Sequence, residues 1–89
     1  MTREDILQTA YDAVNGSRHE DYGSAENNFK TIAKFWNAYL NMDNVIDAKD
    51  VAAMMALLKI ARIASGHGKQ DNWVDLAGYA ACGGEIECK

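Results

Sequence analysis

Two acids one turn apart lie in the last third of the chain, where paired carboxylates could do chemistry. Asp71 and Asp75 have the i, i+4 spacing that puts two side chains on one face of a helix. Such a pair could bind a divalent cation through oxygen ligands. Asp71 is also the expected N-cap of its helix, and Asp75 could pair with a basic side chain, so a cap with an ion pair is the competing interpretation.

The basic side chains that could pair with Asp75 lie in the preceding apolar segment. Lys59 and Arg62 are three residues apart and therefore share a face of the helix predicted there. A buried cation needs a partner. Asp75 and Asp71 could supply it, or an anionic ligand could, since arginine binds phosphate and carboxylate in a bidentate manner. The two interpretations can coexist.

A polar segment near residue 20 adds groups that could recognise a small molecule. Its side chains could contact a base or ribose, and the helix N-terminus at Ser24 could receive a phosphate. His19 and His67 are both interpreted as solvated. With Tyr79, one turn after Asp75, the predicted ligand-binding set comprises Arg18, Tyr22, Asn28, Lys59, Arg62, Asp75 and Tyr79.

The sequence contains no complete catalytic set, so no catalytic residue and no obligatory cofactor is predicted. It has no glycine loop of the P-loop or dinucleotide type, and no Cys/His spacing of a zinc site. Cys82 and Cys88 would lie about 9 Å apart along one helix, too far to bridge, so free thiols in a reducing compartment are expected.

The length and net charge of the chain limit the kinds of protein it can be. The 89 residues predict a single domain over 1–89, and a net charge of −4 argues against bulk binding of nucleic acid. The sequence shows no signal peptide and no apolar run that could span a bilayer, which predicts a cytoplasmic protein with no membrane partner. A chain this short has a marginal core, and oligomerisation is a common supplement.

Helical periodicity and capping residues predict the elements that position these groups. Four segments have this periodicity and are predicted to be helices. Their capping residues are Thr2, Ser24, Asp47 and Asp71, and glycines end the first helix at Gly16 and the third at Gly66. Because the connections are short, the prediction is an all-α, compact bundle of about four antiparallel helices that forms a homo-oligomer.

Two of these helices have unusual surfaces. The third is apolar nearly all round up to Lys59, which predicts either the central helix of the fold or the seam of an oligomer. The fourth begins with Trp73, expected in the core, and carries Gly78, Gly83 and Gly84. These glycines predict close helix packing, or clearance for a ligand to approach the backbone.

Three runs together resemble an uncharacterised family of small, mostly bacteriophage-encoded all-helical domains: YGSAENNFKTIAKFWNAYL, DVAAMMALLKIARIASG and DNWVDLAGYAACGGEIE. The likeness covers about residues 21–87 and implies a phage origin, with the host cytoplasm as location, and a helical fold. A more distant similarity is to the MazG and dUTPase type of all-α nucleotide pyrophosphohydrolase. That family holds magnesium with paired acids, of which only Asp71 and Asp75 have a counterpart here.

Three functional hypotheses follow from these observations. The first is a phage accessory protein that acts by binding rather than by catalysis, either a nucleotide-type anionic ligand or a host defence factor. The second is a divergent MazG-like, magnesium-dependent nucleotide pyrophosphohydrolase. The third is a structural or protein-interaction module whose motifs only stabilise the bundle.

Overall fold

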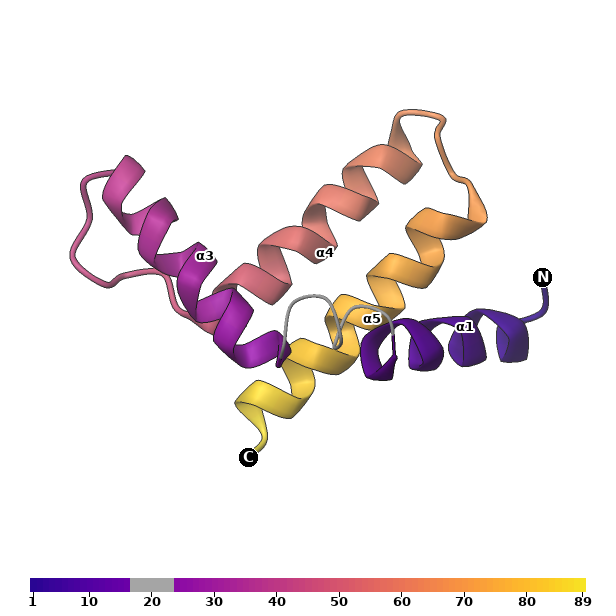
Figure 1. Cartoon of the computed structure of the whole chain (residues 1–89). Coiled ribbons are helices and arrows are strands. Elements are labelled where there is room, and N and C mark those ends of the chain that lie inside the picture. Colours follow the sequence, from indigo (N-terminus) through magenta and orange to yellow (C-terminus); the bar gives the residue numbers. More distant parts are fainter. Residues whose placement is uncertain (17–23) are drawn as a thin grey trace.

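The chain folds into helices connected by short turns (Figure 1). The structure, a computed structural model, describes residues 1–16 and 24–89. Over these residues it contains four helices and no strand, as the sequence predicts. The helices are α1 (Arg3–Asn15), α3 (Ala25–Tyr39), α4 (Ala48–Ala64) and α5 (Gln70–Glu87).

Three of the four helices begin at the predicted capping residues. The Thr2 hydroxyl accepts from the backbone N–H of Asp5 at 3.1 Å, and the Asp5 carboxylate accepts from the N–H of Thr2 at 3.0 Å. Asp47 and Asp50 make the same reciprocal pair at 3.0 and 3.1 Å. The hydroxyl of Ser24 accepts from the N–H three residues on, at 3.2 Å. Side chains thus satisfy N–H groups that have no partner inside the helix.

The start of α5 differs from the prediction. Lys69 is the N-cap, and no side chain caps this helix. Asp71 therefore lies in the first turn, where its charge still favours the helix dipole, and its predicted role as N-cap is wrong. Trp73, expected in the core, is 48% exposed, and the neighbouring Val74 is buried in its place.

Helix α5 contacts each of the other three helices, most extensively α4 and then α1 (Figure 1). Glycine allows the close approach. A Cβ atom at Gly83 would lie 3.0 Å from the Cβ of Ala52 in α4, and one at Gly78 would lie 3.2 Å from Cγ1 of Val14 in α1. The predicted close packing of α5 is therefore present, and α5 rather than α4 occupies the centre of the fold.

The buried core is built mainly from small side chains. Phe29 is its one aromatic residue among those described, and alanines and valines make up the rest. Several large apolar residues of α1 and α3, together with the residue that follows α3, are exposed, namely Leu7, Tyr11, Tyr39 and Leu40. Figure 1 shows why: α1 meets α5 through its C-terminal end and points away from it, and α3 diverges from α4 along its length.

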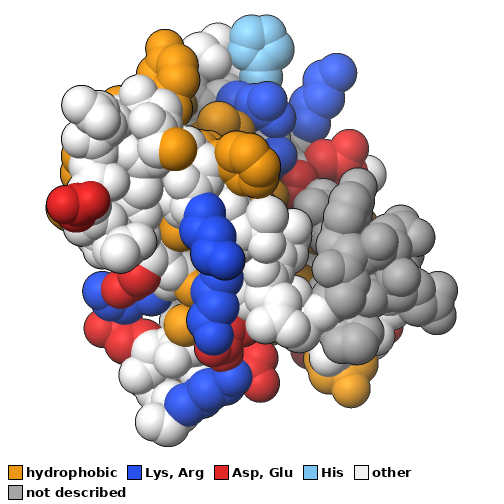
Figure 2. Space-filling model, turned by 60° about the vertical axis from the view of Figure 1, so that its left-hand side comes forward, with side chains coloured by type: hydrophobic (Ala, Val, Ile, Leu, Met, Phe, Trp, Pro, Cys, Tyr) orange, Lys and Arg blue, Asp and Glu red, His pale blue; other side chains and the backbone are white. Residues whose placement is uncertain are grey.

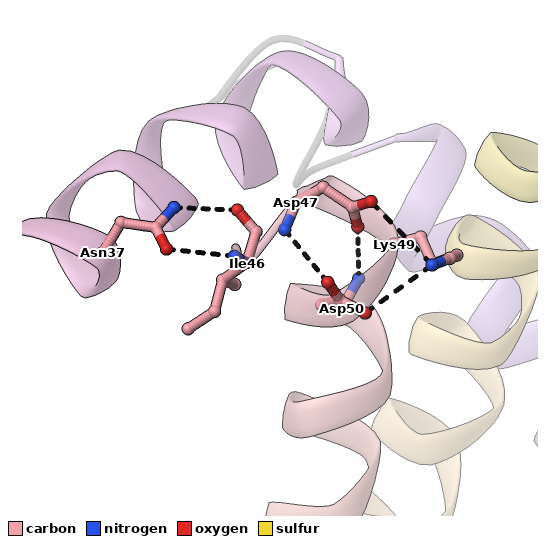
Figure 3. A network of polar contacts seen from close by, with 5 residues as sticks. All are labelled: Asn37, Ile46, Asp47, Lys49 and Asp50. Atoms are coloured by element: carbon pink, nitrogen blue, oxygen red, sulfur yellow. Dashed lines mark hydrogen bonds and ion pairs between the residues drawn. The ribbon is translucent and has the colours of Figure 1, made fainter. Parts of the chain in front are cut away.

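A buried amide connects α3 to the turn that leads into α4 (Figure 3). The side chain of Asn37 donates to the carbonyl of Ile46 at 2.8 Å and accepts from its N–H at 2.9 Å. Within this turn Asn41 and Asn44 adopt left-handed backbone angles, with φ of 56° and 52°. Asparagine tolerates that conformation better than most residues, so the sequence of the turn suits its path.

Replacing Asn37 tests this connection. Asn37→Leu leaves both polar groups of the Ile46 backbone without their partner, which we expect to lower the free energy of unfolding by about 2–4 kcal/mol. Urea unfolding monitored by circular dichroism measures the change. Asn27→Leu, at an exposed position of the same helix, should change stability by less than about 0.5 kcal/mol. Equal effects of the two substitutions would contradict the connection.

The capping carboxylates make stability depend on acid. The backbone N–H of Asp50, and more weakly Lys49, lowers the pKa of Asp47 below its ordinary 3.8. Such a group contributes stability that is complete above the unfolded pKa and is lost as the pH falls through the folded value. We therefore expect the urea midpoint to fall between pH 5 and pH 2.5.

The matched variants separate this cap from general acid unfolding. Asp47→Asn should make the fall in urea midpoint smaller, because the residue no longer titrates. Asp43→Asn, at an exposed position in the preceding turn, should leave it as in the wild type. A fall of the same size in Asp47→Asn and wild type would show that the cap does not contribute.

Candidate functional site

An ion pair between α4 and α5 lies at the middle of the candidate site. The ammonium of Lys59 is 2.9 Å from Oδ2 of Asp75, and the two side chains are 10% and 22% exposed. Lys59 lies on the face of α4 that also carries Ala48 and Ala52, so its helix phase directs it towards α5. The predicted partnership of Asp75 with the basic residues is therefore confirmed for Lys59.

A pocket lies on one side of this ion pair, where all four helices meet. It has a volume of about 200 Å³ and mainly apolar walls. The rings of Phe29 and Tyr79 line it with their centroids 6.1 Å apart, and Gly78 leaves room beside them. Asn28 and Asp75 contribute its other polar groups. Apolar walls with a few polar groups are typical of small-molecule sites.

A second, more open hollow lies on the other side of Asp75. It is lined by the basic residues Lys59, Arg62 and Lys69 and by the acids Asp71 and Asp75, and Asp75 lines the pocket as well. Figure 2 shows a histidine and basic side chains together at the upper edge of the molecule, with acidic side chains just below them. The basic side chains make this hollow suited to an anion.

The turn between α4 and α5 brings these basic residues together. The N–H of His67 donates to the carbonyl of Arg62 at 3.0 Å, and the side-chain amide of Asn72 donates to the carbonyl of His67. Gly66, with φ of 89°, provides the left-handed residue that ends α4. The turn is therefore held to both helices, and Lys69 follows it directly.

The structure divides the predicted ligand residues between the two hollows. Asn28, Asp75 and Tyr79 line the pocket, whereas Lys59 and Arg62 line the basic hollow with Asp75. Arg18 and Tyr22, together with His19, lie outside the described residues.

Sequence reasoning missed three residues of the basic hollow. His67, predicted to be solvated, is exposed but also lines this hollow, and Lys69 and Asn72, which were not considered, line it too. Their place in the short turn after Arg62 is the signal that could have identified them.

The metal candidates Asp71 and Asp75 do not form a larger cluster in the described part of the chain. Over residues 1–16 and 24–89, no three His, Cys, Asp or Glu side chains lie close enough to hold a metal ion. Cys82 lines the pocket and Cys88 is exposed, and both are free thiols. Among the described helices, none has the length and apolar character needed to cross a membrane.

The fold and the site thus define a small all-helical protein with an apolar pocket beside a basic hollow. Residues 5–87 match the family described as domain of unknown function DUF6378, and the chain belongs to that family. Gene 55 protein of Mycobacterium phage L5 is 48% identical over 75 residues, covering 84% of this chain and 47% of the relative. Gene 55 protein of Mycobacterium phage D29 is 40% identical over 79 residues, covering 89% and 51%.

These relatives confirm the predicted likeness to an uncharacterised family with phage members. The chain spans about half the length of both curated relatives. No solved structure is significantly similar to the chain. The similarity to MazG-type pyrophosphohydrolases has no match among these proteins and stays a prediction.

The ion pair gives a prediction for stability. Lys59→Met leaves the partly buried Asp75 carboxylate without its ammonium partner, which we expect to cost about 2–4 kcal/mol of unfolding free energy. Asp75→Leu should cost a similar amount. The double variant should recover at least half of the summed loss, because both members of the ion pair are then removed together.

Urea unfolding of the four proteins in this cycle measures the coupling between the two residues. Lys49→Met is the control, since Lys49 lies on the same helix with its side chain 42% exposed and pairs with Asp47 and Asp50, whose side chains are 60% and 40% exposed. It should change stability by less than about 0.5 kcal/mol. Strict additivity of Lys59→Met and Asp75→Leu would contradict the pairing.

Proposed function

We propose that this protein is an accessory protein of the phage type that acts by binding a nucleotide-type ligand. The observation that supports this most directly is the pair of adjoining hollows that share Asp75, one apolar and one basic. A molecule that joins a flat ring to a phosphate likewise has one apolar part and one anionic part. Binding, not catalysis, is the proposed activity.

The apolar pocket fits the ring of such a ligand. Its volume of about 200 Å³ is of the order needed for one nucleobase, and Phe29 and Tyr79 supply aromatic surface. Every base has a π-face that can stack on an aromatic side chain. Asn28, with an amide that both donates and accepts, could hydrogen-bond to a base edge.

The basic hollow fits the phosphate. Arg62 and Lys69 contribute positive charge in addition to Lys59, which already pairs with Asp75. The N-terminus of α5 lies at the same place and has no side-chain cap. Backbone N–H groups at a helix start and the helix dipole both favour an anion.

The pyrophosphohydrolase alternative gains less support. Helix α3 carries Glu26, which pairs with Lys30 at 3.2 Å and with Lys89. Helix α4 carries Asp50, which belongs to the capping pair with Asp47. Magnesium-dependent phosphoryl chemistry needs several converging carboxylates. Glu26 and Asp50 already have partners of their own, and neither pairs with a residue of the candidate site. A host defence factor as partner remains an alternative to a small ligand.

Calorimetry with the whole protein tests the proposal. The probes are a set of purine and pyrimidine nucleoside monophosphates, the matching nucleosides, and inorganic phosphate. We expect at least one nucleotide to bind more tightly than its nucleoside and than phosphate. Arg62→Ala should weaken the nucleotide at least tenfold at low salt because a charge-assisted contact is lost, and should leave the nucleoside unchanged.

Tyr79→Phe, which removes a hydroxyl that could bond to the base or ribose, and Asn28→Leu should weaken nucleoside and nucleotide alike, by about three- to tenfold per lost hydrogen bond. Tyr39→Phe is the matched control, since Tyr39 is exposed on α3 and outside both hollows. If no nucleotide binds, or if Arg62→Ala and Tyr39→Phe behave alike, the proposal is wrong. Release of pyrophosphate or phosphate from a triphosphate, lost in Asp75→Asn, would favour the enzymatic alternative instead.

A further inference from the structure

We propose that the outer face of α4 is the interface of a symmetric dimer, in which α4 of a second copy packs against it in the antiparallel direction. This surface is distinct from the two hollows, and the proposal does not depend on the ligand. It rests on the faces of α4, on the area that the chain leaves exposed, and on the symmetry of the residues along the helix.

Helix α4 has two apolar faces, and only one is covered. Its inner face, with Val51, Ala52 and Lys59, is buried against the rest of the chain. The opposite face follows the helical spacing and carries exposed large side chains at Met54, Leu57 and Ile60. These residues and the alanines that share their side of the helix, Ala53, Ala61 and Ala64, are here named the outer α4 face.

The outer α4 face carries no charge along its middle three turns. The charges of that part of the helix, Lys59 and Arg62, lie on other sides of it, Lys59 in the ion pair and Arg62 in the basic hollow. A surface helix of a monomer normally turns polar residues outward, so this face is expected to be covered.

The chain exposes more surface than a compact monomer of its mass. The chain exposes 6326 Å² at a mass of 9.8 kDa, whereas a compact monomer of that mass exposes about 5,200 Å². The radius of gyration is 13.6 Å against about 12 Å expected for this length. The excess of roughly 1,100 Å² includes exposed residues of α1 and α3 as well as those of α4, and it is large enough to include the roughly 800 Å² that each partner contributes to a standard interface.

The arrangement of residues favours a second copy over an unrelated partner. An interface about a twofold axis must be complementary to itself. Around Leu57 the outer α4 face is nearly palindromic, because Ala53 and Ala61 lie four residues to either side, and Met54 and Ile60 lie three. An antiparallel pair centred on Leu57 therefore places Ala53 opposite Ala61 of the partner. The small residues allow the helices to approach closely.

The net charge of the chain is compatible with this arrangement. Two copies of a chain with net charge −4 repel one another, and contact through an uncharged face keeps the acids at the surface of the dimer. In the antiparallel arrangement the dipoles of the two α4 helices also oppose each other, which is favourable.

Sedimentation equilibrium of the whole protein over about 1–100 µM tests the dimer. We expect a mass of twice 9.8 kDa for the wild type. Leu57→Glu should reduce it to the monomer or raise the dissociation constant at least a hundredfold. Leu7→Glu is the matched control, since Leu7 is 64% exposed and Leu57 63% exposed, and should remain dimeric. A monomeric wild type, or a dimer unaffected by Leu57→Glu, overturns the proposal.

Cross-linking tests the geometry even if Leu57→Glu fails to fold. In a Cys82→Ser, Cys88→Ser background, Leu57→Cys places two thiols at the axis and should form a covalent dimer under mild oxidation. Ala64→Cys places them about 20 Å apart, since each lies seven residues from the axis at 1.5 Å per residue, and should not. Cross-linking through Ala64→Cys but not through Leu57→Cys would overturn the antiparallel arrangement.

Discussion

Everything in this fold is arranged around α5, and α5 keeps its place because glycine lets its backbone come close to two neighbours. At Gly83 the limit is set by Ala52, and at Gly78 by Val14. Glycine in the middle of a helix costs about 1 kcal/mol relative to alanine. The contacts made to α1 and α4 offset that cost, so a weak helix by propensity becomes the centre of the molecule.

The close approach also explains where the site lies. When helices meet through small residues, the larger side chains at the edges of the contact cannot fill the junction completely. The pocket opens at this junction, beside Gly78, with Phe29 and Tyr79 along its walls. Asp75, one turn before Tyr79 on α5, reaches Lys59 on α4 and separates the pocket from the basic hollow. Packing and recognition therefore involve the same turn of α5.

Short-range features of the fold could be predicted from the sequence, and long-range ones could not. Thr2, Ser24 and Asp47 were identifiable as caps because a cap depends only on the next three residues. The prediction of Asp71 as an N-cap was wrong because the N-cap is Lys69, two residues earlier, which makes no side-chain capping bond. The pairing of Lys59 with Asp75 followed from charge, whereas the pocket depends on the angles at which α1 and α3 meet α5, which no local pattern records.

The central position of α5 has a consequence for synthesis on the ribosome. Helices α1 and α3 emerge first, and among the described helices α1 packs chiefly on α5, the last to emerge. Until α5 has been synthesised, α1 has no surface to pack against, and the inner face of α4 is covered only where α3 packs on it. The nascent chain is therefore most prone to aggregation or capture by a chaperone while α4 is complete and α5 is not.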